Sequence, residues 1–212
     1  MINLILDCSC GMNVYIVKDD EVFLKIDSTQ NKHSDEILLA IDCLLKEAGV
    51  KINDVNNICV CVGPGSFTGV RVAISLAKGL SIGIGAKVYV LTNFEIFDIE
   101  DRENSCLVLD GFSSYVYARK FKSGKIIDEC IDVNQFKKDI EELQMNVFVT
   151  SEKTQNLLKK YEINSKIIKN NIINAFKYEI LNNKSTQLNQ IFPVYLRASQ
   201  AEIEREKKLK NG

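Results

Sequence analysis

Cysteine and histidine are the residues of this chain that could bind a metal. One residue separates Cys8 from Cys10 and Cys59 from Cys61, and His33 is the only histidine. Two cysteines at this spacing on a strand point to the same face, whereas structural zinc sites generally use cysteines two to four residues apart on turns. A single histidine cannot supply a paired-histidine site, and cysteine also packs well in apolar cores. We therefore expect core cysteines, no bound metal, and a hydrogen-bonding role for His33 at a helix start rather than a role in catalysis.

A block of seven residues, GPGSFTG at positions 63–69, could form a phosphate loop or hold a nucleophile. It lacks the GxGxxG spacing of a dinucleotide site and the Lys-Ser or Lys-Thr pair of a phosphate loop. Ser66 directly follows a glycine, so the block is not the GxSxG elbow of a serine hydrolase. Ser66 and Thr68 can instead accept hydrogen bonds from the first free N–H groups of a helix. The block therefore predicts a tight turn between a strand at 58–62 and a helix at 68–83.

The helix at 68–83 is apolar on nearly all sides, which is typical of a helix that is buried nearly all round. At 100° per residue, Arg71 and Lys78 lie opposite the face that suits a sheet. Ile74 lies on one flank, and Ser75 and Gly79 lie on the other. Small residues at four-residue spacing let another backbone come close. The helix is therefore either the central helix of a large domain or a helix with one flank that contacts a second protein chain.

The overall composition, with 46% hydrophobic and 26% charged residues, is ordinary for a globular protein. A net charge of −1 gives no electrostatic footprint for binding tRNA or a membrane by the chain alone. The first residues lack the basic region of a signal peptide, and Lys78 and Lys87 interrupt the best candidate for a membrane span. An odd number of cysteines, seven, suits reduced thiols. These features predict a cytoplasmic protein without a membrane partner.

The order of expected strands and helices repeats once along the chain. The first copy has strands at 3–7, 13–18 and 21–27, a helix at 34–48, a strand at 58–62, a helix at 68–83, a strand at 87–91 and a short helix at 94–99. A charge-rich break at 100–104 precedes the second copy, with strands at 106–110, 115–122 and 125–130, a helix at 133–143, a strand at 146–150 and a helix at 152–161. A further helix is expected at 172–181, and a charged tail ends the chain.

Asp7 and Asp110 end the first strand of each copy. A duplication of this kind is similar to the actin-like ATPase fold, in which the turns after these two strands hold nucleotide phosphates. The usual Asp-x-Gly of those turns is here Asp-Cys-Ser at 7–9 and Asp-Gly-Phe at 110–112. We therefore predict a two-lobed α/β protein of the actin-like, ribonuclease H-like fold, built from duplicated β-β-β-α-β-α units. Its phosphate turns are degenerate, so we expect no nucleotide cofactor.

Two short sequences carry a family resemblance. GPGSFTGVR at 63–71, followed by a helix of small residues, and PVYLR at 193–197 resemble the TsaB (YeaZ) family of the tRNA threonylcarbamoyladenosine machinery. The resemblance implies a non-catalytic scaffold that binds and activates TsaD, the subunit that transfers a threonylcarbamoyl group to the adenosine next to the tRNA anticodon. It also implies binding of the ATPase subunit TsaE, access to tRNA through the complex, and a homodimer.

The same resemblance places the partner-binding surface on the two N-terminal helices. We expect partner contacts from His33, Leu39, Cys43, Arg71, Ile74, Ser75, Lys78 and Gly79. The expected domains are an N-terminal lobe at 1–99, a C-terminal lobe at 100–190 and a C-terminal segment at 191–212.

Two other functions stay open at this point. A phosphotransferase or ATPase of the same fold requires phosphate turns with their glycines in place, and an ATP dissociation constant would separate it from a scaffold. A protease requires a nucleophile beside a base, which Ser66 and one histidine do not offer from the sequence. Activity on casein would test for a protease.

Overall fold

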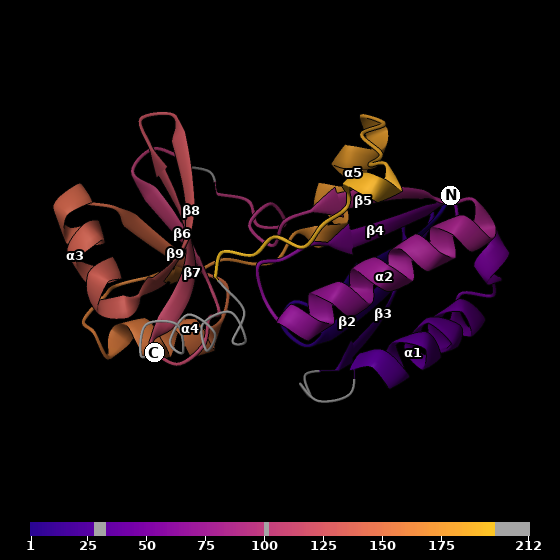
Figure 1. Ribbon diagram of the computed structural model, residues 1–212, viewed down its shortest axis with the longest axis horizontal. Helices are drawn as coiled ribbons and strands as arrows, with labels where there is room; N and C mark the ends of the chain where they lie inside the picture. The colour runs from indigo at the N-terminus through magenta and orange to yellow at the C-terminus, as the bar shows by residue number, and fades with distance from the viewer. Residues whose placement is uncertain (28–32, 100–101, 198–212) are drawn as a thin grey trace, which may run out of the picture. The chain divides into compact units, whose positions relative to one another are not determined.

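The computed structural model describes residues 1–27, 33–99 and 102–197 and divides the chain into two units. The first unit contains Met1–Asp98 and Lys169–Val194. The second contains Ile99–Ile168 and, among the described residues, 195–197. Each unit consists of one sheet with helices packed on it (Figure 1).

The first unit is built on a five-stranded sheet with the order β3-β2-β1-β4-β5. The first three strands form an antiparallel meander, and β4 and β5 continue the sheet in parallel with β1. All residues of β4 are buried, which is typical of a parallel strand covered on both faces. The strands are β1 (Ile2–Asp7), β2 (Met12–Lys18), β3 (Glu21–Asp27), β4 (Asn57–Cys61) and β5 (Lys87–Leu91).

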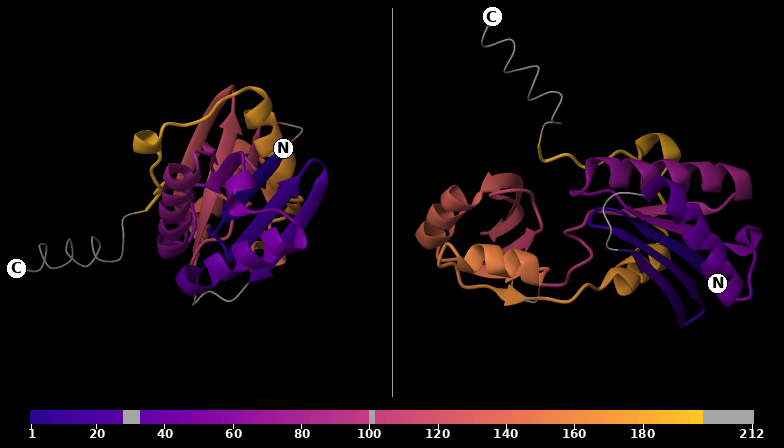
Figure 2. Two further views of the ribbon diagram at one scale, coloured as in Figure 1. Left: turned by 90° about the vertical axis from the view of Figure 1, so that its right-hand side faces the viewer. Right: turned by 90° about the horizontal axis from the view of Figure 1, so that it is seen from below.

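Helices cover both faces of this first sheet. The helices α1 (His33–Glu47) and α2 (Phe67–Ile84) lie side by side on one face (Figure 1). The helix α5 (Ile172–Leu181) covers the other face (Figure 2). Phe176 of this helix belongs to one buried cluster with Tyr89 and Cys59 of the sheet. Short 3-10 helices complete the unit: η1 (Ile52–Asp54) and η2 (Leu188–Gln190).

The second unit repeats the topology of the first. Its five-stranded sheet has the order β10-β9-β6-β7-β8, with the same pattern of antiparallel and parallel pairs. The strands β6 and β8 therefore correspond to β1 and β3, which confirms the predicted duplication and fold class. The elements are β6 (Ser105–Leu109), β7 (Tyr115–Lys122), β8 (Lys125–Asp132), α3 (Val133–Leu143), β9 (Asn146–Val149), α4 (Glu152–Lys159) and β10 (Lys166–Ile167).

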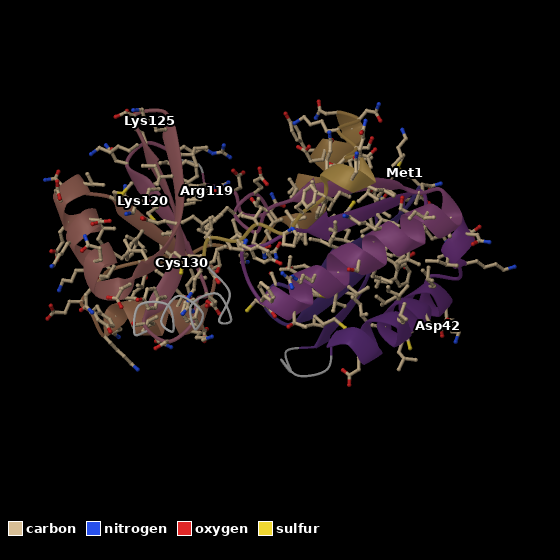
Figure 3. All side chains as sticks on the ribbon, in the orientation of Figure 1. Met1, Asp42, Arg119, Lys120, Lys125 and Cys130 are labelled. Carbon is tan, nitrogen blue, oxygen red and sulfur yellow. The ribbon has the colours of Figure 1, made fainter. Side chains whose placement is uncertain are left out.

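Ion pairs reinforce the second unit at β7 and β8. Lys120, which is 6% exposed, forms ion pairs with Asp139 at 2.5 Å and with Glu129. Figure 3 labels Lys120 and its neighbour Arg119. Arg119 makes two hydrogen bonds of 2.7 Å to the Asp128 carboxylate. Burial alone would lower the pKa of Lys120, but the hydrogen bonds to the two acids outweigh burial and leave that pKa raised. The ammonium group is therefore held charged inside the unit.

The structure differs from the sequence expectations at two places. Residues 169–194 return to the first unit rather than extending a lobe at 100–190, because Ile172 and Phe176 cover the second face of the first sheet. Residues 93–96 form turns and Phe97 forms an isolated β-bridge with Asn170, in place of the expected short helix at 94–99. The charged tail expected after 197 lies outside the described residues.

The helix α2 is long and apolar enough to pass a test of length and composition for a membrane span. One side of it is nevertheless packed into the protein. Its buried residues join the core between the sheet and α1, as expected of a central helix: Gly69, Val70, Ala73, Ile74 and Ala77.

Candidate functional site

Asp7, at the end of β1, is bound by the turn that follows it. The Asp7 carboxylate accepts hydrogen bonds from the Ser9 backbone N–H at 3.0 Å and from the Ser9 hydroxyl at 2.6 Å. The Ser9 oxygen in turn accepts a hydrogen bond from the Asn93 side-chain amide. Burial raises the pKa of Asp7, and these hydrogen bonds oppose that rise only in part. The carboxylate therefore has its hydrogen-bonding partners within the protein.

The GPGSFTG turn packs directly on this Asp7 turn, because β1 and β4 are parallel neighbours whose carboxyl ends meet. The Ser66 backbone N–H donates a 2.7 Å hydrogen bond to the Ser9 carbonyl. A Cβ atom on Gly65 would lie 2.5 Å from the same carbonyl oxygen. The Ser66 hydroxyl accepts from the Gly69 N–H at 3.2 Å and so caps α2. The glycines of the motif thus allow two backbones to touch at the place where the fold would hold a phosphate.

Asp110 occupies the corresponding place in the second unit, directly after β6. Its carboxylate accepts hydrogen bonds from the hydroxyls of Ser151 and Thr154, at the start of α4. The Ser151 hydroxyl also caps α4 by accepting from the Thr154 N–H at 3.1 Å. A Cβ atom on Gly111 would lie 2.0 Å from the Tyr115 carbonyl oxygen, so the turn is tightly closed. In both units, the expected phosphate-turn aspartate is bound by hydroxyl groups of the protein.

The predicted partner-binding residues divide between an exposed face and the core. Leu39 is 66% exposed on α1, Cys43 is also exposed there, and Ser75 and Gly79 are exposed on α2. Ile74, by contrast, is 5% exposed and packs in the core of the first unit.

The remaining predicted residues lie on the same two helices. The Arg71 guanidinium stacks over the Phe67 ring at 3.7 Å, and Lys78 is half-buried with its ammonium 5.5 Å from the Phe192 ring. His33 begins α1, and its side chain lies outside the described residues.

Two exposed residues were not predicted from the sequence. Leu38 is 55% exposed and Ile82 is 75% exposed. Ile82 continues the stripe of Ser75 and Gly79 at helical spacing, a signal that the sequence did contain. We call the set of exposed residues Leu38, Leu39, Cys43, Ser75, Gly79 and Ile82 the α1–α2 face.

The two cysteine pairs do not converge on one site. Cys59 and Cys61 lie in the core beneath α5, whereas Cys8 lies in the core on the α1 and α2 side of the same sheet. Cys10, which was also expected in the core, is instead exposed, because β1 ends at Asp7 and Cys10 lies in the turn after it. Burial raises the pKa of the Cys8 thiol to about 12, and burial likewise raises the pKa of Cys59. These buried thiols behave as core residues, as predicted.

The PVYLR segment connects the first motif to the second unit. The Val194 N–H donates a 2.7 Å hydrogen bond to the Val62 carbonyl, just before the GPGSFTG turn. Arg197 lies 3.8 Å from the centre of the Phe112 ring and 5.7 Å from that of Tyr115, which are stacked on each other. Arg197 was not a predicted site residue, although it belongs to the second motif.

Comparisons with known proteins agree with the fold. Two solved structures from Pseudomonas aeruginosa cover 92% of this chain: one is described as similar to the peptidase YEAZ (TM-score 0.72, 19% identity, 99% of that chain), the other as YeaZ (TM-score 0.67, 18% identity, 100% of that chain). At these identities the likeness establishes the fold, a two-lobed actin-like one.

Sequence relatives carry a more specific name. The Haemophilus influenzae tRNA threonylcarbamoyladenosine biosynthesis protein TsaB is 30% identical over 53% of this chain and 50% of its own length. A Buchnera aphidicola protein of the same name is 25% identical over 81% of this chain and 77% of its own length. The chain thus spans about half the length of the Haemophilus relative that it matches.

A family model provides the assignment. It is described as TsaD, tRNA N6-adenosine threonylcarbamoyltransferase, and it matches residues 27–138, more than half of the chain. This stretch contains the GPGSFTG turn, the α1–α2 face and the Asp110 turn. The chain therefore belongs to the TsaD family, with proteins named TsaB among its relatives.

Proposed function

We propose that the chain is a non-catalytic subunit in the synthesis of N6-threonylcarbamoyladenosine in tRNA. In this role it binds the catalytic threonylcarbamoyltransferase, TsaD, through the α1–α2 face in the cytoplasm. The ATPase subunit TsaE and the tRNA join the same complex, and the chain also forms a homodimer. The observation that carries the proposal is an exposed apolar helix face in a chain whose relatives are named for this pathway.

The α1–α2 face has the chemistry of a protein interface. Leu38, Leu39 and Ile82 are each more than half exposed, although apolar residues of this size are usually buried. Nothing lies within 4 Å of a Cβ built on Gly79 or Gly83, so a second backbone can approach α2 there. Exposed apolar side chains on helices, together with helix backbone that is open to close approach, suit contact with another protein chain.

The two aspartate turns support a role without catalysis. A phosphate at either turn would meet a buried or half-buried carboxylate that already accepts hydrogen bonds from Ser9, or from Ser151 and Thr154. An ATPase or phosphotransferase would need those turns open. A protease would need the Ser66 hydroxyl as a nucleophile, but this hydroxyl caps α2. Both alternatives are therefore less well supported than a scaffold.

A binding experiment with the TsaD subunit of the same organism tests the proposal. We expect the wild-type chain to form a complex in gel filtration, and Leu39→Asp or Ile82→Asp to weaken it more than tenfold. The melting temperature of each variant should stay close to wild type, because both side chains are exposed. Ile127→Asp, at a 52% exposed position on β8, is the control and should bind normally. If Leu39→Asp and Ile82→Asp both bind TsaD normally, the α1–α2 face is not the binding surface.

A further inference from the structure

The chain passes from one unit to the other three times. The crossings lie between residues 98 and 99, 168 and 169, and 194 and 195. The first two crossings are adjacent on the first unit, because Phe97, just before the first crossing, forms a β-bridge with Asn170, just after the second. Two adjacent connections are typical of a hinge, about which two units can rotate. The third crossing is therefore the connection that can restrict this hinge.

The third crossing belongs to the C-terminal segment at 188–197, which is firmly held on the first unit. Ile191 is 1% exposed and belongs to the core cluster of that unit. The Val194 N–H donates its 2.7 Å hydrogen bond to the Val62 carbonyl. A Cβ atom on Gly63 would lie 3.0 Å from the Val194 carbonyl oxygen, so the two backbones are in close contact there. The segment is thus fixed up to its last residue in the first unit.

On the second unit, the same segment is held through the side chain of Arg197. The Arg197 guanidinium lies 3.8 Å from the centre of the Phe112 ring and 5.7 Å from that of Tyr115. The Phe112 ring is itself supported, because it stacks on Tyr115 at 5.3 Å and meets the Tyr117 ring edge-on at 6.5 Å between centroids. A guanidinium is attracted to the face of an aromatic ring. Because Arg197 is exposed, this contact can open without unpacking a core, unlike the contact of Ile191.

The charge of Arg197 acts on two further groups of the second unit. Tyr117 of β7 and Cys130 of β8 are paired across the two strands. Burial raises the pKa of the Tyr117 phenol and of the Cys130 thiol, and the positive charge of Arg197 opposes both rises. The guanidinium therefore lies close to this part of the second sheet as well as to the Phe112 ring.

Each of the two anchors adjoins a degenerate phosphate turn. Val62 directly precedes the GPGSFTG turn, which packs on the Asp7 turn of the first unit. Phe112 is the second residue after Asp110, in the corresponding turn of the second unit. In an actin-like protein that binds a nucleotide, the turns of both units hold its phosphates, so the nucleotide connects the two units.

We propose that the segment at 188–197 is a strap that restricts the hinge between the two units, with Arg197 as its releasable end. Only two residues separate Val194 from Arg197, so the Cα atoms of these two anchors can be about 11 Å apart at most. While Arg197 stays on Phe112, the units can rotate only as far as this short connection allows. When that contact opens, the two adjacent crossings alone connect the units. The strap thus replaces, within the chain itself, the connection that a nucleotide would make.

Distances between spin labels on the two units test whether the strap restricts the hinge. The three cysteines that are not buried are first replaced by serine: Cys10, Cys43 and Cys130. The labels are then attached at Leu181→Cys on α5 and Ile127→Cys on β8, which are 84% and 52% exposed, and excess unlabelled protein removes distances between chains. We expect a narrow distribution of distances, and roughly twice its width on Arg197→Ala. The melting temperature should stay close to that of the parent, because Arg197 is exposed.

Phe112→Leu changes the other side of the same contact. It should widen the distribution as much as Arg197→Ala, and the double variant should show no further widening, because both changes open one contact. Lys184→Ala is the matched control, because the Lys184 ammonium lies 5.0 Å from the Tyr178 ring within the first unit alone. It should leave the distribution narrow. A parent protein whose distribution is as broad as that of Arg197→Ala overturns the proposal, and so does equal widening on Lys184→Ala.

Hydrogen exchange at the Val194 amide tests which end of the strap is releasable. We expect this N–H to stay protected on Arg197→Ala, because its hydrogen bond to Val62 and the burial of Ile191 do not depend on Arg197. Protection at Val194 together with a widened distribution of distances would support release at Arg197 alone. Loss of protection at Val194 on the same substitution would show that the whole segment detaches, and would reject Arg197 as the releasable end.

Discussion

Gly69 lies directly against the backbone of Cys8, so that a Cβ atom on Gly69 would be 2.0 Å from the Cys8 carbonyl oxygen. Contacts this close are not seen for real Cβ atoms, and the obstacle is backbone rather than a flexible side chain. The start of α2 is thereby fixed to the turn after β1. The last glycine of the GPGSFTG motif is thus explained by packing within the first unit, with no ligand required.

Gly69→Ala should therefore destabilise the protein by about 1–3 kcal/mol or more, the usual range for overpacking a core. Gly79→Ala is the matched control on the same helix, because nothing lies within 4 Å of its Cβ. That change should stabilise the protein by about 0.5–1 kcal/mol, the helix preference of alanine over glycine. Urea denaturation measures both, and equal effects of the two substitutions would contradict the packing argument.

The buried Asp7 predicts a pH dependence with a definite sign. Because burial raises the pKa of Asp7 above its ordinary 3.8, the folded state holds the proton more tightly than the unfolded state. Its contribution to stability is therefore largest at low pH and falls as pH rises through the folded pKa. Asp7→Asn removes this loss, so the stability of the variant relative to wild type should increase between pH 4 and pH 8.

Asp132→Asn provides the opposite control. Hydrogen bonds from the Ser114 hydroxyl and the Asn134 N–H lower the pKa of Asp132, so its carboxylate stabilises the fold above its unfolded pKa. The stability of that variant relative to wild type should fall as pH rises. Urea denaturation at several pH values measures both slopes. If the stability of both variants relative to wild type changes with pH in the same direction, burial does not control the pKa of Asp7.

The aspartate turns also predict weak nucleotide binding or none. In the first unit, the Ser9 hydroxyl donates a hydrogen bond to the Asp7 carboxylate. In the second unit, the hydroxyls of Ser151 and Thr154 donate hydrogen bonds to the Asp110 carboxylate. Calorimetry with ATP and magnesium should detect no binding in the micromolar range. A micromolar dissociation constant would favour the phosphotransferase alternative and require the turns to open.

The strands, the duplication and the two aspartate positions could be predicted from sequence, because each depends on local patterns. Alternating and continuous apolar runs indicate strands, and glycine with proline marks the turn before α2. The sheet on which α5 packs could not be predicted in this way. The apolar stripe of α5 predicts that Ile172 and Phe176 are buried against another element, but it does not indicate which of the two sheets they pack on.

The exposed face of α2 was only half predictable for a related reason. Helical spacing groups Ile82 with Ser75 and Gly79 and places Ile74 on the other flank. Because the helix is apolar on nearly all sides, this spacing could not show which flank is buried, as Ile74 is, and which is exposed, as Ile82 is. The distinction depends on where α1 packs, a tertiary contact. The predicted set of partner-binding residues therefore mixes core and surface positions.

Lys120 should be among the most sensitive positions of the second unit. Lys120→Met leaves the carboxylates of Glu129 and Asp139 without their buried cation, which typically costs about 3–5 kcal/mol. Lys137→Met is the control, because its ion pair with the exposed Glu162 should contribute less than about 1 kcal/mol. Thermal and urea unfolding compare the two. Similar losses for both variants would mean that burial of the Lys120 ion pairs is unimportant.

The two flanks of α2 should respond in different ways to substitution. Ile74 is 5% exposed in the core, so Ile74→Asp strands a carboxylate there and should cost about 3 kcal/mol or more. Gly79 is exposed with nothing within 4 Å of its Cβ, so Gly79→Leu should leave the melting temperature nearly unchanged. The leucine would nevertheless keep a partner backbone away from α2, and we expect it to abolish the complex with TsaD in gel filtration. If Gly79→Leu binds normally, α2 is an ordinary surface helix and the α1–α2 face loses its central contact.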